Sequence, residues 1–159
     1  EVIAVGTADE LGRAMDATAP DADVIVMAAA VADYSVAAVS EHKLRKQDST
    51  GALTLELVEN RDVVAGLVAA RRPHQTIVAF AAETVDGEEE LVERARAKVA
   101  RKGVDLLAAN AVGWTRGFET ADNALTIVGR DGDVVATASG TKDETAHALL
   151  DAVLVTRSS

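Results

Sequence analysis

Two uninterrupted apolar runs constrain the fold of this chain more than any other feature. They cover residues 24–27 and 76–81, and neither alternates apolar with polar side chains. A strand with one face in water alternates, whereas a parallel strand covered on both faces does not. A third run covers residues 104–109 and is apolar apart from Asp105. The sequence therefore predicts a mostly parallel sheet with helices on both faces.

Helix-start signals lie between these runs. Thr7 and Thr141 each begin a capping-box pattern, in which a Thr and a Glu three residues later satisfy each other's backbone N–H groups. Acidic residues at 86–89 favour a third start through the helix dipole, and Asn60 is the expected N-cap of a fourth helix. We expect helices near residues 7–18, 60–71, 87–102 and 141–156.

The alternation of strand and helix is typical of βαβ units with crossover helices. Near the carboxyl end, expected strands at 124–129 and 134–138 flank Asp131-Gly132, which is a strong hairpin signal. Residues 1–5 form a further expected strand. With 159 residues the chain fits one domain, so we predict a single three-layer α/β domain over residues 1–159 with a C-terminal hairpin.

One segment interrupts this alternation. Residues 42–58 contain a basic stretch, a polar turn and an alternating stretch with Leu53, Leu55 and Leu57 on one face. This pattern predicts a two-stranded antiparallel arm. An isolated hairpin is marginal in water, so the leucine face must dock on this subunit or on a second one.

Charge and composition exclude several classes of function. Sixteen basic against twenty-six acidic residues give a net charge of −10, which argues against sequence-independent nucleic-acid binding and against a polybasic membrane surface. No apolar run reaches the ~18 residues that span a bilayer, and no signal peptide opens the chain. The absence of cysteine removes disulfides and thiolate nucleophiles. We expect a soluble, cytoplasmic protein.

Small and polar residues follow the buried strands. Residues 28–32 are small and lead to Asp33, and Phe80 lies near the end of the second run, before Glu83. Open α/β sheets bind ligands at the carboxyl ends of their strands, where small residues let a ligand approach the backbone. Asp33 would suit a ribose hydroxyl or a metal, or it is an ordinary cap beside tight packing. Anionic nucleotide binding is the hypothesis that unites these strand ends.

Two groups of cations allow alternative interpretations. Lys43, Arg45 and Lys46 on the arm could bind an anion, or they could protect an edge strand from aggregation.

Arg94, Lys98 and Lys102 stack on one helix face at i, i+4 and i+8. A bound polyphosphate would relieve their mutual repulsion. Alternatively, Glu90 pairs with Arg94 and the cations simply suit a helix C-terminus.

Taken in order, these segments resemble the phosphopantothenate–cysteine ligase (phosphopantothenoylcysteine synthetase) domain of bacterial bifunctional coenzyme A biosynthesis proteins. The motifs that carry the resemblance over nearly the whole chain are Ala28-Ala29-Ala30-Val31-Ala32-Asp33-Tyr34, Lys43-Leu44-Arg45-Lys46, Asn60-Arg61-Asp62-Val63, Phe80-Ala81-Ala82-Glu83-Thr84, Lys98 with Lys102, Ala109-Asn110 and Asp122-Asn123-Ala124-Leu125.

The resemblance implies a Rossmann-like fold and a homodimer that exchanges an arm across its interface. Members of the family join 4′-phosphopantothenate to cysteine and convert CTP to CMP and pyrophosphate through an acyl-cytidylate. Magnesium accompanies the triphosphate. The resemblance also implies fusion to, or association with, a phosphopantothenoylcysteine decarboxylase domain.

The resemblance further implies roles for individual residues, none of them as a metal ligand. Lys43 matches the first lysine of a Lys-x-Lys-Lys motif and is the expected catalytic residue. Arg45 replaces a lysine of that motif, which keeps the charge but changes the donor geometry. The expected nucleotide-binding residues are Met27, Ala28, Ala29, Asp33, Asn60, Arg61, Asp62, Val63, Phe80, Lys98 and Lys102.

The chain departs from the family at its amino end. The glycine-rich turn and the Asn-x-Ser-Ser-Gly segment of the family are absent, so the chain is expected to lack an N-terminal segment. The alternative function is a non-catalytic nucleotide-binding or dimerisation fragment of the same fold. A dinucleotide-binding oxidoreductase is disfavoured because no Gly-x-Gly-x-x-Gly follows a first strand. The preference for CTP over ATP rests on the resemblance alone.

Overall fold

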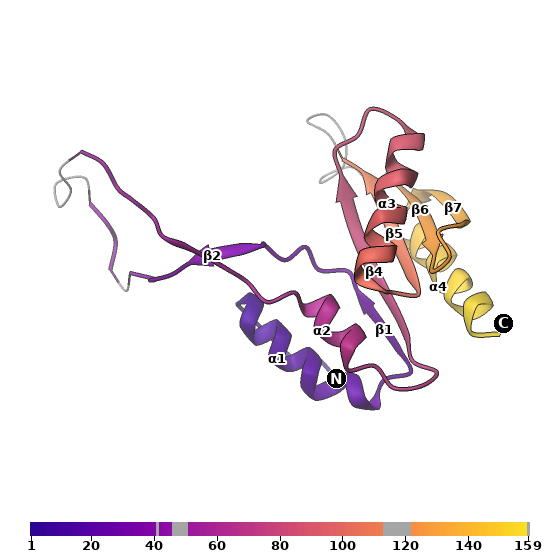
Figure 1. The fold of residues 1–159 in the computed structure, drawn as a ribbon, viewed down its shortest axis with the longest axis horizontal. Coiled ribbons are helices and arrows are strands. Elements are labelled where there is room, and N and C mark those ends of the chain that lie inside the picture. Colours follow the sequence, from indigo (N-terminus) through magenta and orange to yellow (C-terminus); the bar gives the residue numbers. More distant parts are fainter. Residues whose placement is uncertain (41, 46–50, 113–121, 159) are drawn as a thin grey trace.

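The computed structural model describes residues 1–40, 42–45, 51–112 and 122–158, and it contains one five-stranded sheet (Figure 1). Its strands follow the order β1-β4-β5-β6-β7. β1, β4 and β5 are parallel, and β6 is antiparallel to both β5 and β7, so four of the five strands point the same way. The strands are β1 (Val24–Met27), β4 (Thr76–Glu83), β5 (Leu106–Ala111), β6 (Asp122–Gly129) and β7 (Val134–Thr141).

Helices cover both faces of the sheet, which confirms the predicted layers. One core cluster joins the sheet to three helices, and a second cluster joins its other face to the fourth helix (Figure 1). The first three helices are α1 (Ala8–Thr18), followed by the short 3₁₀ turn η1 (Ala19–Asp21), α2 (Val63–Ala69) and α3 (Glu88–Lys102), and the fourth is α4 (Lys142–Ser158).

The two-sided cover explains the uninterrupted apolar run in β4. Ile77 and Ala79 belong to the cluster under α1, α2 and α3, whereas Val78 belongs to the cluster under α4. These three side chains are at most 4% exposed. Because both faces are dry, no position in the middle of this strand is left for a polar residue.

The helix-start signals are confirmed at both capping boxes. The Glu10 N–H donates to Thr7 Oγ1 at 3.1 Å, and the Thr7 N–H donates to Glu10 Oε2 at 3.1 Å. The Glu144 N–H donates to Thr141 Oγ1 at 3.3 Å, and the Thr141 N–H donates to Glu144 Oε2 at 2.8 Å. Each box satisfies orphan donors in the first turn of its helix.

The expected start of the second helix at Asn60 is wrong. The N-cap of this helix, α2, is Asp62, whose side chain accepts from the Ala65 N–H at 3.0 Å. The helix therefore begins at Val63. The Asn60 side chain instead donates to the Ala32 carbonyl oxygen at 2.9 Å.

The arm is confirmed, but its strands differ from the expected 42–58. β2 (Tyr34–Val36) and β3 (Leu57–Glu59) form an antiparallel pair at the root of the arm, and the Ala37 N–H continues the pairing to the Glu56 carbonyl at 2.9 Å. Residues 42–45 are in no strand, and Lys46 and the expected turn at 47–50 lie outside the described residues.

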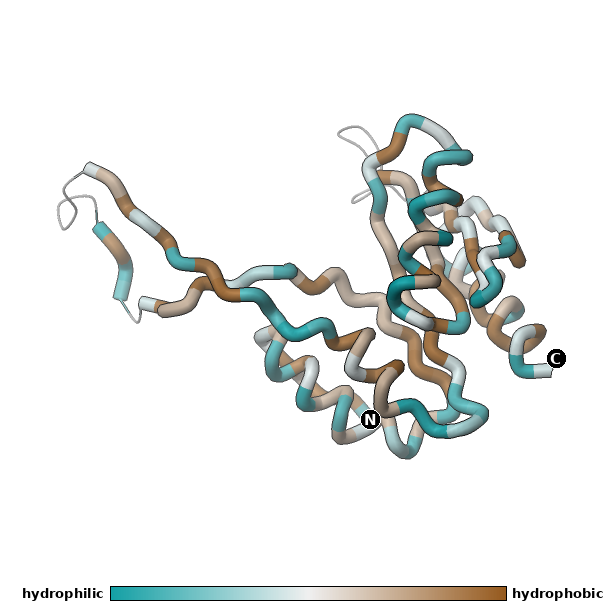
Figure 2. Tube along the Cα trace, in the orientation of Figure 1, coloured by the Kyte–Doolittle hydropathy of each residue, from teal (hydrophilic) through white to brown (hydrophobic). Residues whose placement is uncertain are grey.

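The leucine face of the arm does not dock on the body of this chain. Leu53, Leu55 and Leu57 are 63%, 59% and 56% exposed, and Figure 2 shows apolar residues along both limbs of the arm. The sequence analysis allowed the leucine face to dock on this subunit or on a second one, and the first of these is not observed.

The strand expected at residues 1–5 is also not observed. These residues pair with no strand within the described part of the chain, and Val2, Ile3 and Val5 are 93%, 50% and 41% exposed. A strand exists only where a neighbouring strand accepts its hydrogen bonds, and an apolar run alone does not supply that neighbour.

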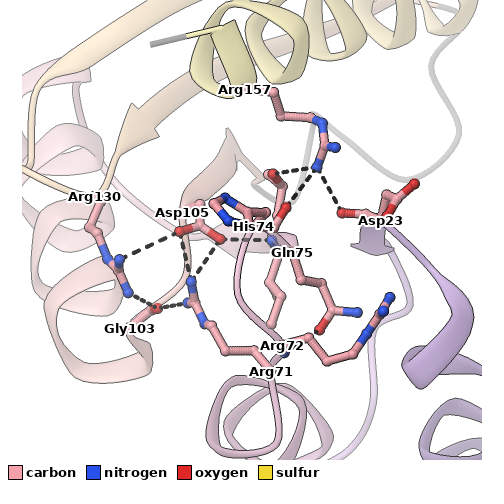
Figure 3. A network of polar contacts seen from close by, with 11 residues as sticks. Asp23, Arg71, Arg72, His74, Gln75, Gly103, Asp105, Arg130 and Arg157 are labelled. Carbon is pink, nitrogen blue, oxygen red and sulfur yellow. Dashed lines mark hydrogen bonds and ion pairs between the residues drawn. The ribbon is translucent and has the colours of Figure 1, made fainter.

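A polar network joins the amino ends of β4 and β5 (Figure 3). Asp105 precedes β5 and accepts from the Ile77 N–H at 2.8 Å and from Arg71 Nη1 at 2.9 Å. Arg157, in the last turn of α4, donates from Nη1 to the carbonyl oxygens of Asp23 at 2.9 Å and His74 at 3.1 Å. This network fixes the end of the sheet opposite to the carboxyl ends of β1 and β4.

We predict that Asp105→Asn destabilises the chain by about 2–3 kcal/mol, because it weakens hydrogen bonds between charged groups at a side chain that is only 14% exposed. Chemical denaturation measures the free energy of unfolding. Asp131→Asn is the matched control in the exposed hairpin turn, where we expect a change within about 0.5 kcal/mol. Equal effects of the two substitutions would contradict the role of the network.

Candidate functional site

A cavity of ≈ 660 Å³ lies at the carboxyl ends of β1 and β4. Residues 29–34, which follow β1, form one wall, and residues 79–82 of β4 form the base. Residues 59–65, which lead into α2, form another wall, and the last turns of α3 contribute cationic side chains. Such a position is the usual ligand site of an open α/β sheet.

The cavity exists because two parallel strands end beside each other and small residues follow. Met27 pairs with Ala79 in register, and Ala29, Ala30 and Ala32 line the space beyond Met27. Their methyl groups leave the backbone of this segment open to a ligand, as the sequence indicated.

Asn60 holds two walls of the cavity together. Its N–H donates to the Asp33 carbonyl oxygen at 2.7 Å, and its side-chain amide donates to the Ala32 carbonyl oxygen at 2.9 Å. Both groups therefore act on the segment that follows β1, 28 residues earlier in the chain.

Arg61 lines the cavity but directs its charge to α1. Its guanidinium donates to the two carboxylate oxygens of Asp16 at 2.5 Å and 2.9 Å, and these hydrogen bonds lower the pKa of Asp16. The same guanidinium passes over Gly66, where a Cβ atom would lie 2.5 Å from Nη2. Arg61 thus ties α1 to α2, and a side chain at Gly66 would require this guanidinium to shift.

Lys98 and Lys102 both line the cavity, and each contacts a carboxylate from another element. Lys98 forms an ion pair with Glu83 at the end of β4, and Lys102 forms one with Asp62 at the start of α2. Partial burial opposes ionisation of Asp62, but hydrogen bonds from Lys102 and from the Ala65 N–H outweigh it and lower its pKa.

The third cation of the predicted face behaves differently. Arg94 does not line the cavity, and its Nη2 donates to Glu90 Oε1 at 2.6 Å, as the ion-pair interpretation expected. Arg101 was not predicted, yet it lines the cavity, and no ion-pair partner is found for it in the described part of the chain. The sequence spacing could have identified Arg101, because a residue three positions after Lys98 lies on the same helix face as Lys98.

Most of the predicted site residues meet at this one cavity. Ala28 belongs to the same segment but does not line the space, and Lys43 lies on the exposed arm, away from it. Tyr34 and Glu59 line the cavity without having been predicted. The predicted residues that line it are Met27, Ala29, Asp33, Asn60, Arg61, Asp62, Val63, Phe80, Lys98 and Lys102.

Comparison with known sequences identifies relatives over nearly the whole chain. The family described as the DNA/pantothenate metabolism flavoprotein C-terminal domain matches residues 1–156. The Coenzyme A biosynthesis bifunctional protein CoaBC of Mycobacterium bovis is 44% identical over 97% of this chain and 38% of its own length. The protein of the same name from Escherichia coli is 41% identical over 82% of this chain and 32% of its own length. The chain thus spans less than half the length of these relatives.

Solved structures share the fold. The DNA/pantothenate metabolism flavoprotein from Streptococcus pneumoniae has a TM-score of 0.73 at 18% identity, covering 98% of this chain and 71% of that one. A Cab2 variant in complex with phosphopantothenate-cysteine has a TM-score of 0.65 at 17% identity, covering 97% of this chain and 52% of that one. Within the described ranges, no helix is both long and apolar enough to cross a bilayer.

We predict that the stability contributed by the Asp62 carboxylate depends on pH. Because its pKa is lower in the folded chain, this contribution is complete above the ordinary aspartate pKa of about 4 and is lost as the pH falls through the folded value. Asp62→Asn keeps an N-cap side chain but loses the charge. The difference in unfolding free energy between the two proteins, measured by urea denaturation, should shrink as the pH falls below about 4. A difference that is constant from pH 7 to pH 3 would show that the charge contributes nothing.

Proposed function

The chain belongs to the DNA/pantothenate metabolism flavoprotein C-terminal domain family, and on this basis we propose that it is the CTP-binding part of a phosphopantothenate–cysteine ligase in coenzyme A biosynthesis. The observation that carries the proposal is the cavity at the carboxyl ends of β1 and β4, where Lys98, Arg101 and Lys102 converge. Three cations on one side of a cavity suit the phosphates of a nucleotide, and the open backbone opposite them suits its nucleoside.

Each wall of the cavity has a proposed part in binding. The backbone of residues 27–29 and 60–63 contacts the cytidine, with Phe80 beside it and Asp33 at the ribose. Lys98 and Lys102 bind the phosphates. Arg101 lines the same cavity and forms no ion pair within the described ranges, although its charge acts on Asp62, so it is the proposed third phosphate ligand.

The proposed reaction has two steps. First, the carboxylate of 4′-phosphopantothenate attacks the α-phosphorus of CTP, the bond to the β-phosphate oxygen breaks, and pyrophosphate leaves. The cysteine amine then attacks the acyl carbonyl, the acyl–oxygen bond to CMP breaks, and the nitrogen releases a proton. The protein acts by holding the reactants together and by placing cations where charge develops on the leaving groups.

Magnesium fits this cavity as a companion of the triphosphate. Within the described residues, no group of three or more acidic or histidine side chains could hold a metal ion by itself. Mg²⁺ is commonly bound by one or two carboxylates together with substrate phosphates. Glu59 also lines the cavity and is the side chain that would hold it together with the phosphates, and the bound ion would offset negative charge on them.

Lys43 is proposed to act on the site of a second copy of the chain. It lies on the arm, which projects from the body of the chain (Figure 1), and it does not line the cavity of its own chain. An arm exchanged in a homodimer would carry Lys43 to the partner's reactants and would cover its own exposed leucine face. The cysteine, 4′-phosphopantothenate and CTP would then meet between two copies.

One observation favours the alternative, a nucleotide-binding and dimerisation fragment without turnover. The proposed catalytic residue Lys43 is not at the cavity of its own chain. Turnover separates the two functions when it is measured in a chain extended at its amino terminus with the corresponding segment of the mycobacterial relative. Lys43→Ala should lower the turnover sharply in the ligase, and an extended chain that binds CTP without turnover would support the fragment.

We predict that this chain binds CTP in the presence of magnesium, and binds it in preference to ATP. Calorimetric titration measures both affinities. Lys98→Met or Lys102→Met should weaken CTP binding roughly tenfold, because each removes a hydrogen bond between charged groups. Lys142→Met is the matched control on the opposite face of the sheet, where the same loss of charge should change the affinity less than about twofold. Equal losses for all three variants would argue against binding in this cavity.

We predict that the chain is a dimer in sedimentation experiments and that the substitution pair Leu53→Ser and Leu55→Ser weakens dimerisation at least about tenfold, since two apolar side chains leave the interface. The matched control is the pair Leu150→Ser and Leu154→Ser on α4, which are 52% and 63% exposed. A wild-type chain that stays monomeric, or equal effects of the two pairs, would exclude dimerisation through the arm.

A further inference from the structure

Glu83 is a buried carboxylate in a position where the fold calls for an apolar side chain. It is the last residue of β4 and is 7% exposed. Ala79 and Ala81 precede it at intervals of two on the same strand, and both belong to the apolar cluster under α3. Because side chains two apart share a face of a strand, Glu83 continues this face toward α3.

Two cations of α3 contact this carboxylate. Lys98 Nζ forms an ion pair with Glu83 Oε1, and Arg94 Nη1 lies 3.5 Å from Oε2. Oε1 is fully enclosed and accepts no hydrogen bond of regular geometry from the residues that the structure describes, so the Lys98 ammonium is the charge that compensates it. A buried carboxylate destabilises a fold unless such a partner is kept close.

Lys98 connects the buried carboxylate to the cavity. Its side chain is 35% exposed, compared with 9% for Glu83, and it lines the cavity while Glu83 does not. An ammonium group has three N–H donors, so contact with Glu83 leaves donors for a ligand. A free lysine side chain samples many rotamers and loses that freedom on binding, and a fixed partner reduces the loss.

We propose that Glu83 is a positioning residue that holds the Lys98 ammonium at the cavity and thereby strengthens the binding of nucleotide phosphates. The proposal deepens the function proposed above and rests on it. It also explains why a charge occupies the apolar face of β4, since an alanine or valine there would pack on α3 but leave Lys98 without an anchor.

Neighbouring ion pairs show what is particular to Glu83. Glu90 also contacts Arg94, but its side chain is 41% exposed and it does not contact Lys98. Asp62 contacts Lys102 from the start of α2, where its side chain is 45% exposed and also caps the helix. Glu83 is thus the one of these three carboxylates that water does not reach freely.

The test is a double-mutant cycle on CTP affinity, measured by calorimetry with magnesium. Glu83→Gln keeps the shape of the side chain and should weaken CTP binding about tenfold in the wild-type background. In the Lys98→Met background the same substitution should change the affinity less than about twofold, because no ammonium remains to be positioned. Glu90→Gln is the matched control, since Glu90 contacts Arg94 and the Asp86 N–H but not Lys98, and it should also stay within about twofold.

Two results would overturn the proposal. One is a Glu83→Gln variant that binds CTP as the wild type does, and the other is an equal loss with and without Lys98, which would indicate a merely structural role. Failure of the wild-type chain to bind CTP would instead overturn the proposed function.

A second measurement needs neither nucleotide nor a folded Lys98→Met variant. In the NMR spectrum of the ligand-free chain, the two ε-protons of Lys98 should have distinct shifts when the side chain is held, and Glu83→Gln should merge them near the random-coil value. The Lys98→Arg variant lacks these lysine ε-protons, so the signals that disappear in its spectrum are those of Lys98. An unchanged Lys98 signal in Glu83→Gln would contradict positioning by Glu83.

Discussion

The parallel pairing of β1 with β4 is the constraint on which the rest of this structure depends. The pairing brings Met27 beside Ala79, so both strands deliver their following residues to the same edge of the sheet. Alanines then leave an open cavity there instead of a packed corner. At the opposite edge, Asp105 and the arginines around it fix the amino ends of β4 and β5, so the strands cannot slide. A binding site on such a sheet requires strands that are held in place and open space at their carboxyl ends, and this sheet has both.

Two of the cations that line the cavity are already paired with carboxylates. Lys98 lies against Glu83 and Lys102 lies against Asp62, so these two ammonium groups repel each other less along α3. The two pairs differ in burial, because the Glu83 side chain is 9% exposed and the Asp62 side chain is 45% exposed. An incoming phosphate can displace an exposed carboxylate more readily than a buried one. We therefore expect Lys102 to leave Asp62 for a phosphate, and Lys98 to stay in contact with Glu83 when the phosphate binds.

Local sequence signals predicted the features that depend on neighbouring residues. The capping boxes and the uninterrupted strands are of this kind, and so is the helical face that holds Lys98 and Lys102, because each follows from spacing within one element. Asn60 shows where such reasoning fails. Asn is a residue type that favours the N-cap position, but the side-chain amide of Asn60 donates to the Ala32 carbonyl oxygen, 28 residues away. No local pattern predicts that contact. The pairing of Lys98 with Glu83 likewise depends on contacts between distant segments, and so does the lack, among the described residues, of a strand partner for residues 1–5.

A crystal structure of this chain with CTP and magnesium would show directly whether the cavity binds the nucleotide through α3. We expect the nucleotide to occupy the cavity between residues 29–34 and 59–65, with phosphate oxygens within hydrogen-bonding distance of Lys98 and Lys102, and with Lys98 still in contact with Glu83. A nucleotide bound elsewhere on the chain, or bound in the cavity with its phosphates turned away from α3, would contradict this expectation.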